Sequence, residues 1–136
     1  MPAEPAVGAG SSTESGVDRA VADFFAGHPT ARAVFARVRA VVEDAGGCTV
    51  RVGRSQVAFR RRRGFAWLWL PGRYLSHPSA DVVLTVALGR HDASPRWKEV
   101  VHPAQAHWVH HLEVHDPAEI DAEVADRLRE AAERAG

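Results

Sequence analysis

The chain has 136 residues, of which 46% are hydrophobic and 25% charged, so it is long enough for one globular domain with a single core. Its 17 basic and 17 acidic residues give a formal net charge of zero, which argues against a general polyanion-binding protein. The charge is unevenly spread: residues 1–46 sum to −2, residues 47–115 to +6 and residues 116–136 to −4. We interpret this pattern as complementarity between terminal helices and a sheet, in preference to a polyanion site.

The N-terminal segment over residues 1–15 is rich in Pro, Gly, Ala and Ser without a period, which predicts a disordered tail. A single domain is expected over residues 16–136. Its first helix is predicted to begin near Ser15 and to run through VDRAVADFFAG, because the apolar residues share one helical face and Gly27 can end the helix.

A second helix is predicted from Pro29 to the pair Gly46-Gly47, because apolar residues recur at helical spacing between them. The pattern then changes to strands. Alternation or β-forming apolar runs predict strands in CTVRVG, QVAFRRR, GFAWLWLP, DVVLTVALG and HWVHHLEVH, with a weaker candidate in KEVVH. Short connections favour an antiparallel sheet of five or six strands, since parallel neighbours need crossover elements.

The last helix has a clear start signal. Asp116 is expected to be its N-cap, Pro117 its first residue and Glu119 the second half of a capping box. Two helices, a sheet and a final helix predict an α+β fold, in which the helices, including the C-terminal one, pack on one sheet face.

Four consecutive arginines, Arg60 to Arg63, precede the aromatic run of the third predicted strand. In an extended strand, successive side chains point to opposite faces, so the four cannot share one surface unless the turn begins earlier. One interpretation is structural: the arginines end a hairpin and discourage edge pairing, and Gly64 supplies a positive φ for its turn. The other is functional, with arginines binding phosphates.

Phe65, Trp67 and Trp69 are predicted to share one strand face, where they form core, line a pocket or stack on bases. We favour the structural interpretation of the arginine run, and an anionic small molecule or nucleic acid as the best candidate partner. The sequence leaves a protein partner or a homodimer open. The candidate ligand-binding residues are Arg60, Arg61, Arg62, Arg73, Trp67, Trp69, His110 and His111.

The segment HPAQAHWVHHLEVH holds five of the eight histidines. His107, His111 and His115 are expected to share a strand face, but steps of four residues separate them by ~13 Å, so we expect no metal site. The rival function is a small enzyme, in which His110 or His111 is the general base of an aromatic-lined pocket. The sequence contains no HExxH, CxxC, GxSxG or Gly-rich phosphate loop, and no cofactor is expected.

Cys48 is the only cysteine, which excludes an intramolecular disulfide and fits a reducing compartment. The N-terminus lacks a basic head followed by an apolar region, and FAWLWL is too short to span a bilayer. We therefore expect a cytoplasmic protein.

The combined pattern resembles the uncharacterised family called domain of unknown function 5655. The resemblance rests on VDRAVADFFAGHPTARAVFARVRAVV and SQVAFRRRRGFAWLWLP, and continues through VVLTVALG, HWVHHLEV and DPAEIDAEVADRLREAA. It covers about residues 16 to 135. It implies a small α+β domain with a predicted-transport label, and it carries over no catalytic residues.

Overall fold

A computed structural model of the chain describes residues 7–73 and 75–136, which form three α-helices and six strands. In chain order the elements are α1 (Val7–Phe24), α2 (Pro29–Asp44), β1 (Thr49–Val52), β2 (Val57–Arg60), β3 (Gly64–Trp69), the 3₁₀ helix η1 (Pro71–Arg73), β4 (Val82–Leu88), β5 (Glu99–Ala104), β6 (His107–Val114), the 3₁₀ helix η2 (Pro117–Glu119) and α3 (Ala122–Arg134). No helix within the described ranges is both long and apolar enough to cross a bilayer.

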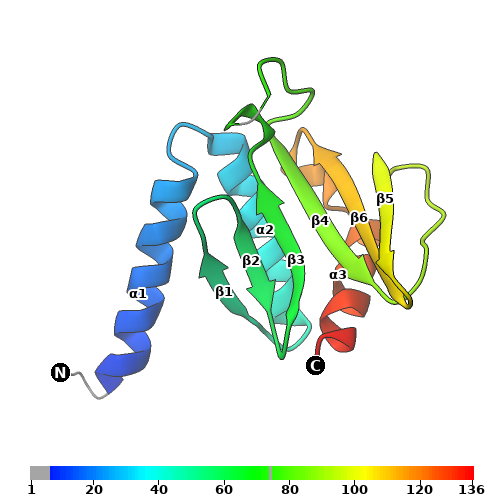
Figure 1. Cartoon of the computed structure of the whole chain (residues 1–136). Coiled ribbons are helices and arrows are strands. Elements are labelled where there is room, and N and C mark those ends of the chain that lie inside the picture. Colours follow the sequence, from blue (N-terminus) through cyan, green and yellow to red (C-terminus); the bar gives the residue numbers. More distant parts are fainter. Residues whose placement is uncertain (1–6, 74) are drawn as a thin grey trace.

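The six strands form one sheet in the order β1-β2-β3-β4-β6-β5, and every neighbouring pair is antiparallel (Figure 1). Strand β5, which has the weakest sequence pattern, lies at one edge of the sheet. Strand β6 lies between β5 and β4 and pairs with both. The predicted α+β fold, with an antiparallel sheet of up to six strands and a C-terminal helix packed on it, is confirmed.

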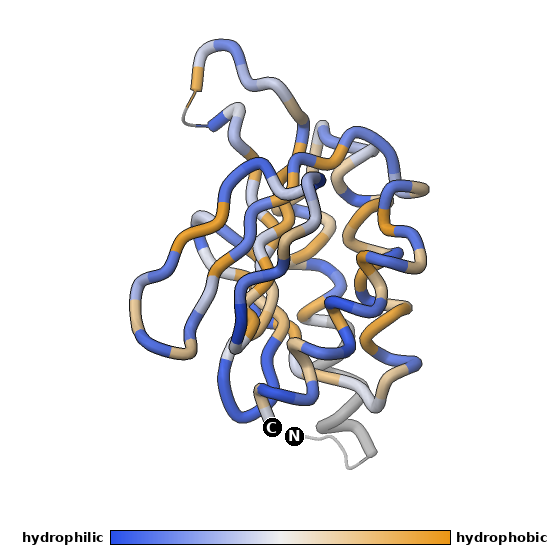
Figure 2. Tube along the Cα trace, turned by 90° about the vertical axis from the view of Figure 1, so that its right-hand side faces the viewer, coloured by the Kyte–Doolittle hydropathy of each residue, from blue (hydrophilic) through white to orange (hydrophobic). Residues whose placement is uncertain are grey.

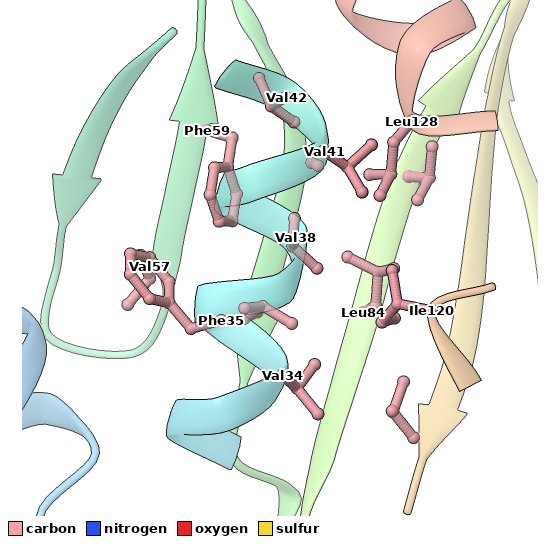
Figure 3. Close-up of a cluster of buried hydrophobic side chains, with 14 of the residues drawn as sticks. Val34, Phe35, Val38, Val41, Val42, Val57, Phe59, Leu84, Ile120 and Leu128 are labelled. Atoms are coloured by element: carbon pink, nitrogen blue, oxygen red, sulfur yellow. The ribbon is translucent and has the colours of Figure 1, made fainter. Parts of the chain in front are cut away.

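The helices pack against one face of the sheet, and the opposite face carries no helix in the described part of the chain (Figure 2). The core lies between these two layers. Val34 and Val38 of α2 meet Leu84 of β4, and Ile120 and Leu128 close the core from the C-terminal side (Figure 3). All five side chains are fully buried, as apolar burial between two layers requires.

Helix α1 begins at Val7, well before the start predicted near Ser15. Residues 1–6 of the predicted tail lie outside the described residues. The end of the helix agrees with the prediction, because Gly27 has a positive φ of 82° just after Phe24. Glycine adopts that conformation without the steric cost that a Cβ would bring.

The last helix begins later than predicted, at Ala122, with Asp121 as its N-cap. The predicted capping residues instead stabilise η2: Asp116 accepts a hydrogen bond from Ala118 N at 2.8 Å, and Glu119 accepts one from His115 N at 2.9 Å. The chain leaves helical geometry at Ile120, whose ψ is 71° and whose side chain is buried. Burial of Ile120 therefore divides the predicted helix into a 3₁₀ turn and α3.

The hairpin between β2 and β3 contains a β-bulge, which corrects two predictions. Phe59 pairs with Ala66 and Arg60 with Gly64, so Phe65 is the extra residue. A bulge redirects side chains, and Phe65 joins the buried core instead of sharing a face with the tryptophans. Gly64 does not have a positive φ.

Glycine is required at position 64 for space. A Cβ at Gly64 would lie 2.8 Å from Trp67 Cζ2, closer than real Cβ contacts allow. The indole of Trp67 therefore rests directly on the backbone at the start of β3.

Candidate site on the open face of the sheet

The open face of the sheet carries side chains that alternate with the core residues of each strand. On β3, Leu68 is fully buried against the helices, whereas Trp67 and Trp69 lie on the opposite face and are half-buried. The register places Trp67 opposite Thr85 of β4, and Thr85 opposite His111 of β6. Three neighbouring strands thus bring aromatic and polar groups together.

These side chains line an open pocket of about 290 Å³. Its lining residues come from the β1–β2 turn and from strands β3, β4 and β6: Ser55, Gln56, Trp67, Trp69, Thr85 and His111. Three of the residues singled out from the sequence, Trp67, Trp69 and His111, therefore converge in one site. The volume lies near the lower limit for small-molecule sites.

A chain of hydrogen bonds crosses the floor of this pocket. Trp69 Nε1 donates to Thr85 Oγ1 at 3.3 Å, and Thr85 Oγ1 lies 2.8 Å from His111 Nδ1. A threonine hydroxyl has one proton. When it donates that proton to Nδ1, neutral His111 carries its own proton on Nε2; when Nδ1 is protonated, the Thr85 hydroxyl proton is free to bond another acceptor. The pocket thus holds an adaptable donor and acceptor pair beside an indole surface.

Sequence reasoning missed Ser55, Gln56 and Thr85. The sequence does mark Thr85, because it is the single polar residue in the strand VVLTVAL. A polar group in a buried strand needs a hydrogen-bond partner. Ser55 and Gln56 lie in the β1–β2 turn, and no local pattern indicates that this turn reaches the tryptophans.

Arg60 is the one member of the arginine run that lies in a strand and on the open face. It pairs with Thr49 and, across the bulge, with Gly64. Its NH1 atom lies 3.4 Å from the position that a Cβ on Gly64 would take, on the same side as the Trp67 ring. Arg60 makes no ion pair with a described residue. Its guanidinium group is therefore available beside Trp67.

Arg61 and Arg63 instead stabilise the C-terminal ends of two helices. Arg61 donates to the carbonyls of Ala45 at 3.0 Å and Gly47 at 2.9 Å, at the end of α2. Arg63 donates to the Arg134 carbonyl at 3.2 Å, at the end of α3. Helix C-termini have unpaired carbonyls and a partial negative charge, both of which favour a guanidinium group.

Arg73 has the same role for α1. It donates to the Phe24 carbonyl at 2.9 Å and to the Arg54 carbonyl at 3.1 Å, and its guanidinium lies 4.4 Å from the centre of the Phe24 ring. Arg62 is exposed, and its side chain runs beside Gly136. None of the candidate arginines, Arg60, Arg61, Arg62 and Arg73, is among the residues that line the pocket.

His110 lies on the face opposite to the pocket and is fully buried. Its Nε2 accepts a hydrogen bond from the backbone of Asp92 at 3.0 Å, and the Trp97 ring packs 5.0 Å away. Burial lowers the pKa of His110 below its usual value, although Asp92 opposes that effect. His110 is therefore a neutral residue of the core side, separate from His111.

The other residues considered for chemistry do not form a reactive centre. No three His, Cys, Asp or Glu side chains in the described ranges are placed to hold a metal ion. His107 and His111 share the open face of β6, and His115 lies just beyond the end of the strand. Cys48 packs against the core, and burial raises the pKa of its thiol, which disfavours the nucleophilic thiolate.

Comparison with known proteins identifies a family but no activity. Neither the curated proteins nor the solved structures give a match. A family model matches residues 21–134, which include α2, α3 and all six strands. Its description states no activity, so a transport role gains no support. The chain belongs to the family described as Domain of unknown function (DUF5655).

Proposed function

We propose that this protein is a binding module that holds a small planar ligand on the open face of its sheet. The observation that carries the proposal is the pocket of about 290 Å³ in which Trp67, Trp69 and His111 converge around Thr85. The two indoles offer the stacking surface. Thr85 and His111 offer hydrogen bonds to the edge of a heterocycle.

Physical considerations favour a planar aromatic ligand over an aliphatic one. Stacking of a flat heterocycle on an aromatic side chain contributes about 1–3 kcal/mol for each ring. The Trp67 ring rests on Gly64, and Trp69 is held by its hydrogen bond to Thr85. Both rings are therefore oriented before a ligand arrives, and preorganisation reduces the entropy lost on binding.

The second candidate is an enzyme with His111 as general base. The 2.8 Å contact between His111 Nδ1 and Thr85 Oγ1 favours it, because a nucleophile and its base lie at such a distance. Thr85, however, is only 7% exposed, and no described carboxylate orients the His111 ring through a hydrogen bond. His110 is fully buried and cannot serve this pocket. We therefore rank binding first.

The test is a fluorescence titration with nucleosides, nucleotides, free nucleobases and indole derivatives at up to millimolar concentration. We expect at least one planar compound to change tryptophan emission saturably. The variants W67A and W69A should weaken that binding at least tenfold, as the loss of about 1.4 kcal/mol or more requires.

The matched control is W108F, because Trp108 lies on the opposite face of β6. This variant should bind as the unchanged protein does. No saturable response to any planar compound, or an equal loss of binding in W108F, would contradict the proposal. Turnover of a bound ester or amide that H111Q abolishes would favour the enzyme instead.

A further inference from the structure

The charge on the open face changes sign across the sheet, from the β1 edge to the β5 edge. One row of paired positions crosses it, because the registers of the strand pairs align: Arg51, Ala58, Trp67, Thr85, His111 and Glu99. The row begins with a cation on the edge strand β1 and ends with a carboxylate on the edge strand β5. The tryptophan pocket lies between these ends.

Arg51 and Arg60 form the cationic side of this face. Both belong to positions that alternate with the core residues Val50 and Phe59, and neither makes an ion pair with a described residue. Between Arg51 and Trp67 lies only the small side chain of Ala58. At the usual spacing of strands, Arg51 is about 10 Å from Trp67 along the row. Two guanidinium groups with no ion-pair partner among the described residues thus lie on the β1 side of the indole surface.

Three other arginines of this region have structural roles. Arg61, Arg63 and Arg73 donate to helix C-terminal carbonyls. Arg51 and Arg60 make no such capping bond with a described residue. A guanidinium group suits phosphate because its donors match the phosphate oxygens in pairs.

The far side of the pocket is unfavourable for a second anionic group. Glu99 pairs with His111 in the register and makes no ion pair with a described residue. Glu113 shares this face; it accepts a hydrogen bond from Ser79, and Lys98 Nζ lies 3.2 Å from its carboxylate. A phosphate chain that continued across β6 and β5 would meet the uncompensated charge of Glu99.

We propose that the site takes a single planar heterocycle with one phosphate monoester, of the size of a nucleoside monophosphate. The inference rests on the proposed function and adds the orientation of the ligand in the pocket. The ring lies on Trp67 and Trp69, and the phosphate points to Arg51 and Arg60. A phosphate monoester carries about −1.5 to −2 charges at pH 7, which two arginines match.

The experiment compares adenosine 5′-monophosphate with adenosine by isothermal titration calorimetry. Adenosine should bind at least tenfold more weakly, because it lacks the charged group. The variants R51A and R60A should each weaken binding of the monophosphate about tenfold and leave the affinity for adenosine unchanged, because each removes guanidinium donors that face only the phosphate. The matched control is R62A, from the same arginine run, because the exposed side chain of Arg62 runs beside Gly136 whereas that of Arg60 lies near Trp67.

Four outcomes would overturn the inference. Adenosine and its monophosphate could bind equally well. This result would support a pocket for planar ligands but contradict a phosphate contact with Arg51 and Arg60. R62A could lose as much affinity as R60A, which would indicate a diffuse charge effect. An oligothymidylate of ten nucleotides could bind more tightly than the monophosphate, with a steep salt dependence, which would assign the face to single strands. Absence of binding by both adenosine compounds would contradict this ligand class and leave the other planar compounds to test the pocket.

Discussion

Arginines at the loops of the sheet hold the ends of all three helices. Arg73, Arg61 and Arg63 bond to the C-terminal carbonyls of α1, α2 and α3 respectively. Each bond joins positions far apart in the chain, and the Arg63 contact with Arg134 spans 71 residues. A guanidinium group supplies both the hydrogen bonds and the charge that a helix C-terminus favours. The positive charge of the central segment is thus used largely within the fold.

Replacement of Arg61 should measurably destabilise the protein. R61A removes the donors to Ala45 and Gly47, so we expect a loss of about 1–2 kcal/mol in the free energy of unfolding. Urea unfolding monitored by circular dichroism measures it. The neighbouring variant R62A is the control, and its change should stay within about 0.5 kcal/mol because Arg62 is exposed. Equal losses in the two variants would contradict helix capping by Arg61.

The buried His110 should make stability depend on pH. Its pKa is lowered in the folded state, so the unfolded chain binds a proton first as the pH falls below about 6.5. Above that pH, His110 is neutral in both states and its contribution to the free energy of unfolding is fully present. As the pH falls from there toward the pKa of the folded state, this contribution is lost at up to about 1.4 kcal/mol per pH unit.

The measurement compares urea unfolding at pH 7.5 and pH 5.5. H110Q retains an acceptor for the Asp92 backbone but cannot be protonated, so its free energy of unfolding should fall less between the two pH values. For each protein, the free energy of unfolding at pH 5.5 is subtracted from that at pH 7.5. The unchanged protein and H110Q are compared by this difference, because the substitution itself also changes packing at both pH values. H115Q is the control, since His115 is exposed. An unchanged pH difference in H110Q would show that His110 carries no such linkage.

At the scale of elements, the bulge in β3 separates residues that strict alternation groups together. Phe65 is 1% exposed and belongs to the core, whereas Trp67 borders the open pocket. F65A should therefore cost about 3–4 kcal/mol, as expected for a buried phenylalanine. W67A should cost about 1 kcal/mol. Chemical denaturation compares the two variants, and a larger loss in W67A would contradict the assignment of faces.

Periodicity could predict the helices, the strands and the face of most strand residues, with Phe65 as the exception because the bulge turns it to the core. Alternation places Trp67 and Trp69 together, and it separates His110 from His111, because each side chain's face depends only on its own strand. The pocket itself could not be predicted. Its formation depends on the pairing of β4 with β6 and on the register that sets Thr85 opposite His111. Such contacts join distant segments, and no local pattern reports them.

The last helix shows the same limit. The capping pattern at Asp116 and Glu119 does begin a helical turn, but tertiary contacts decide where the α-helix itself begins. Ile120 is buried, and its carbonyl accepts a hydrogen bond from Arg37 at 3.2 Å. With that long-range contact and the N-cap at Asp121, α3 starts at Ala122 and not at the predicted Pro117.

For the whole molecule, one continuous core predicts cooperative unfolding. The core cluster includes residues of all three helices and of every strand except β5. Small domains with one core usually unfold in a single transition. We expect tryptophan emission and far-ultraviolet circular dichroism to change at the same urea midpoint. Separate midpoints would show that the sheet and the helix layer unfold independently.

The uncovered sheet face has a kinetic consequence. The pocket is open, and no described helix lies on this face of the sheet, so we expect a ligand to enter the pocket without a prior opening step. In stopped-flow mixing, the observed rate constant should rise linearly with ligand concentration and should not level off, because a plateau signals a slow opening step. Discrimination between ligands would then reside mainly in their residence times on the indole rings.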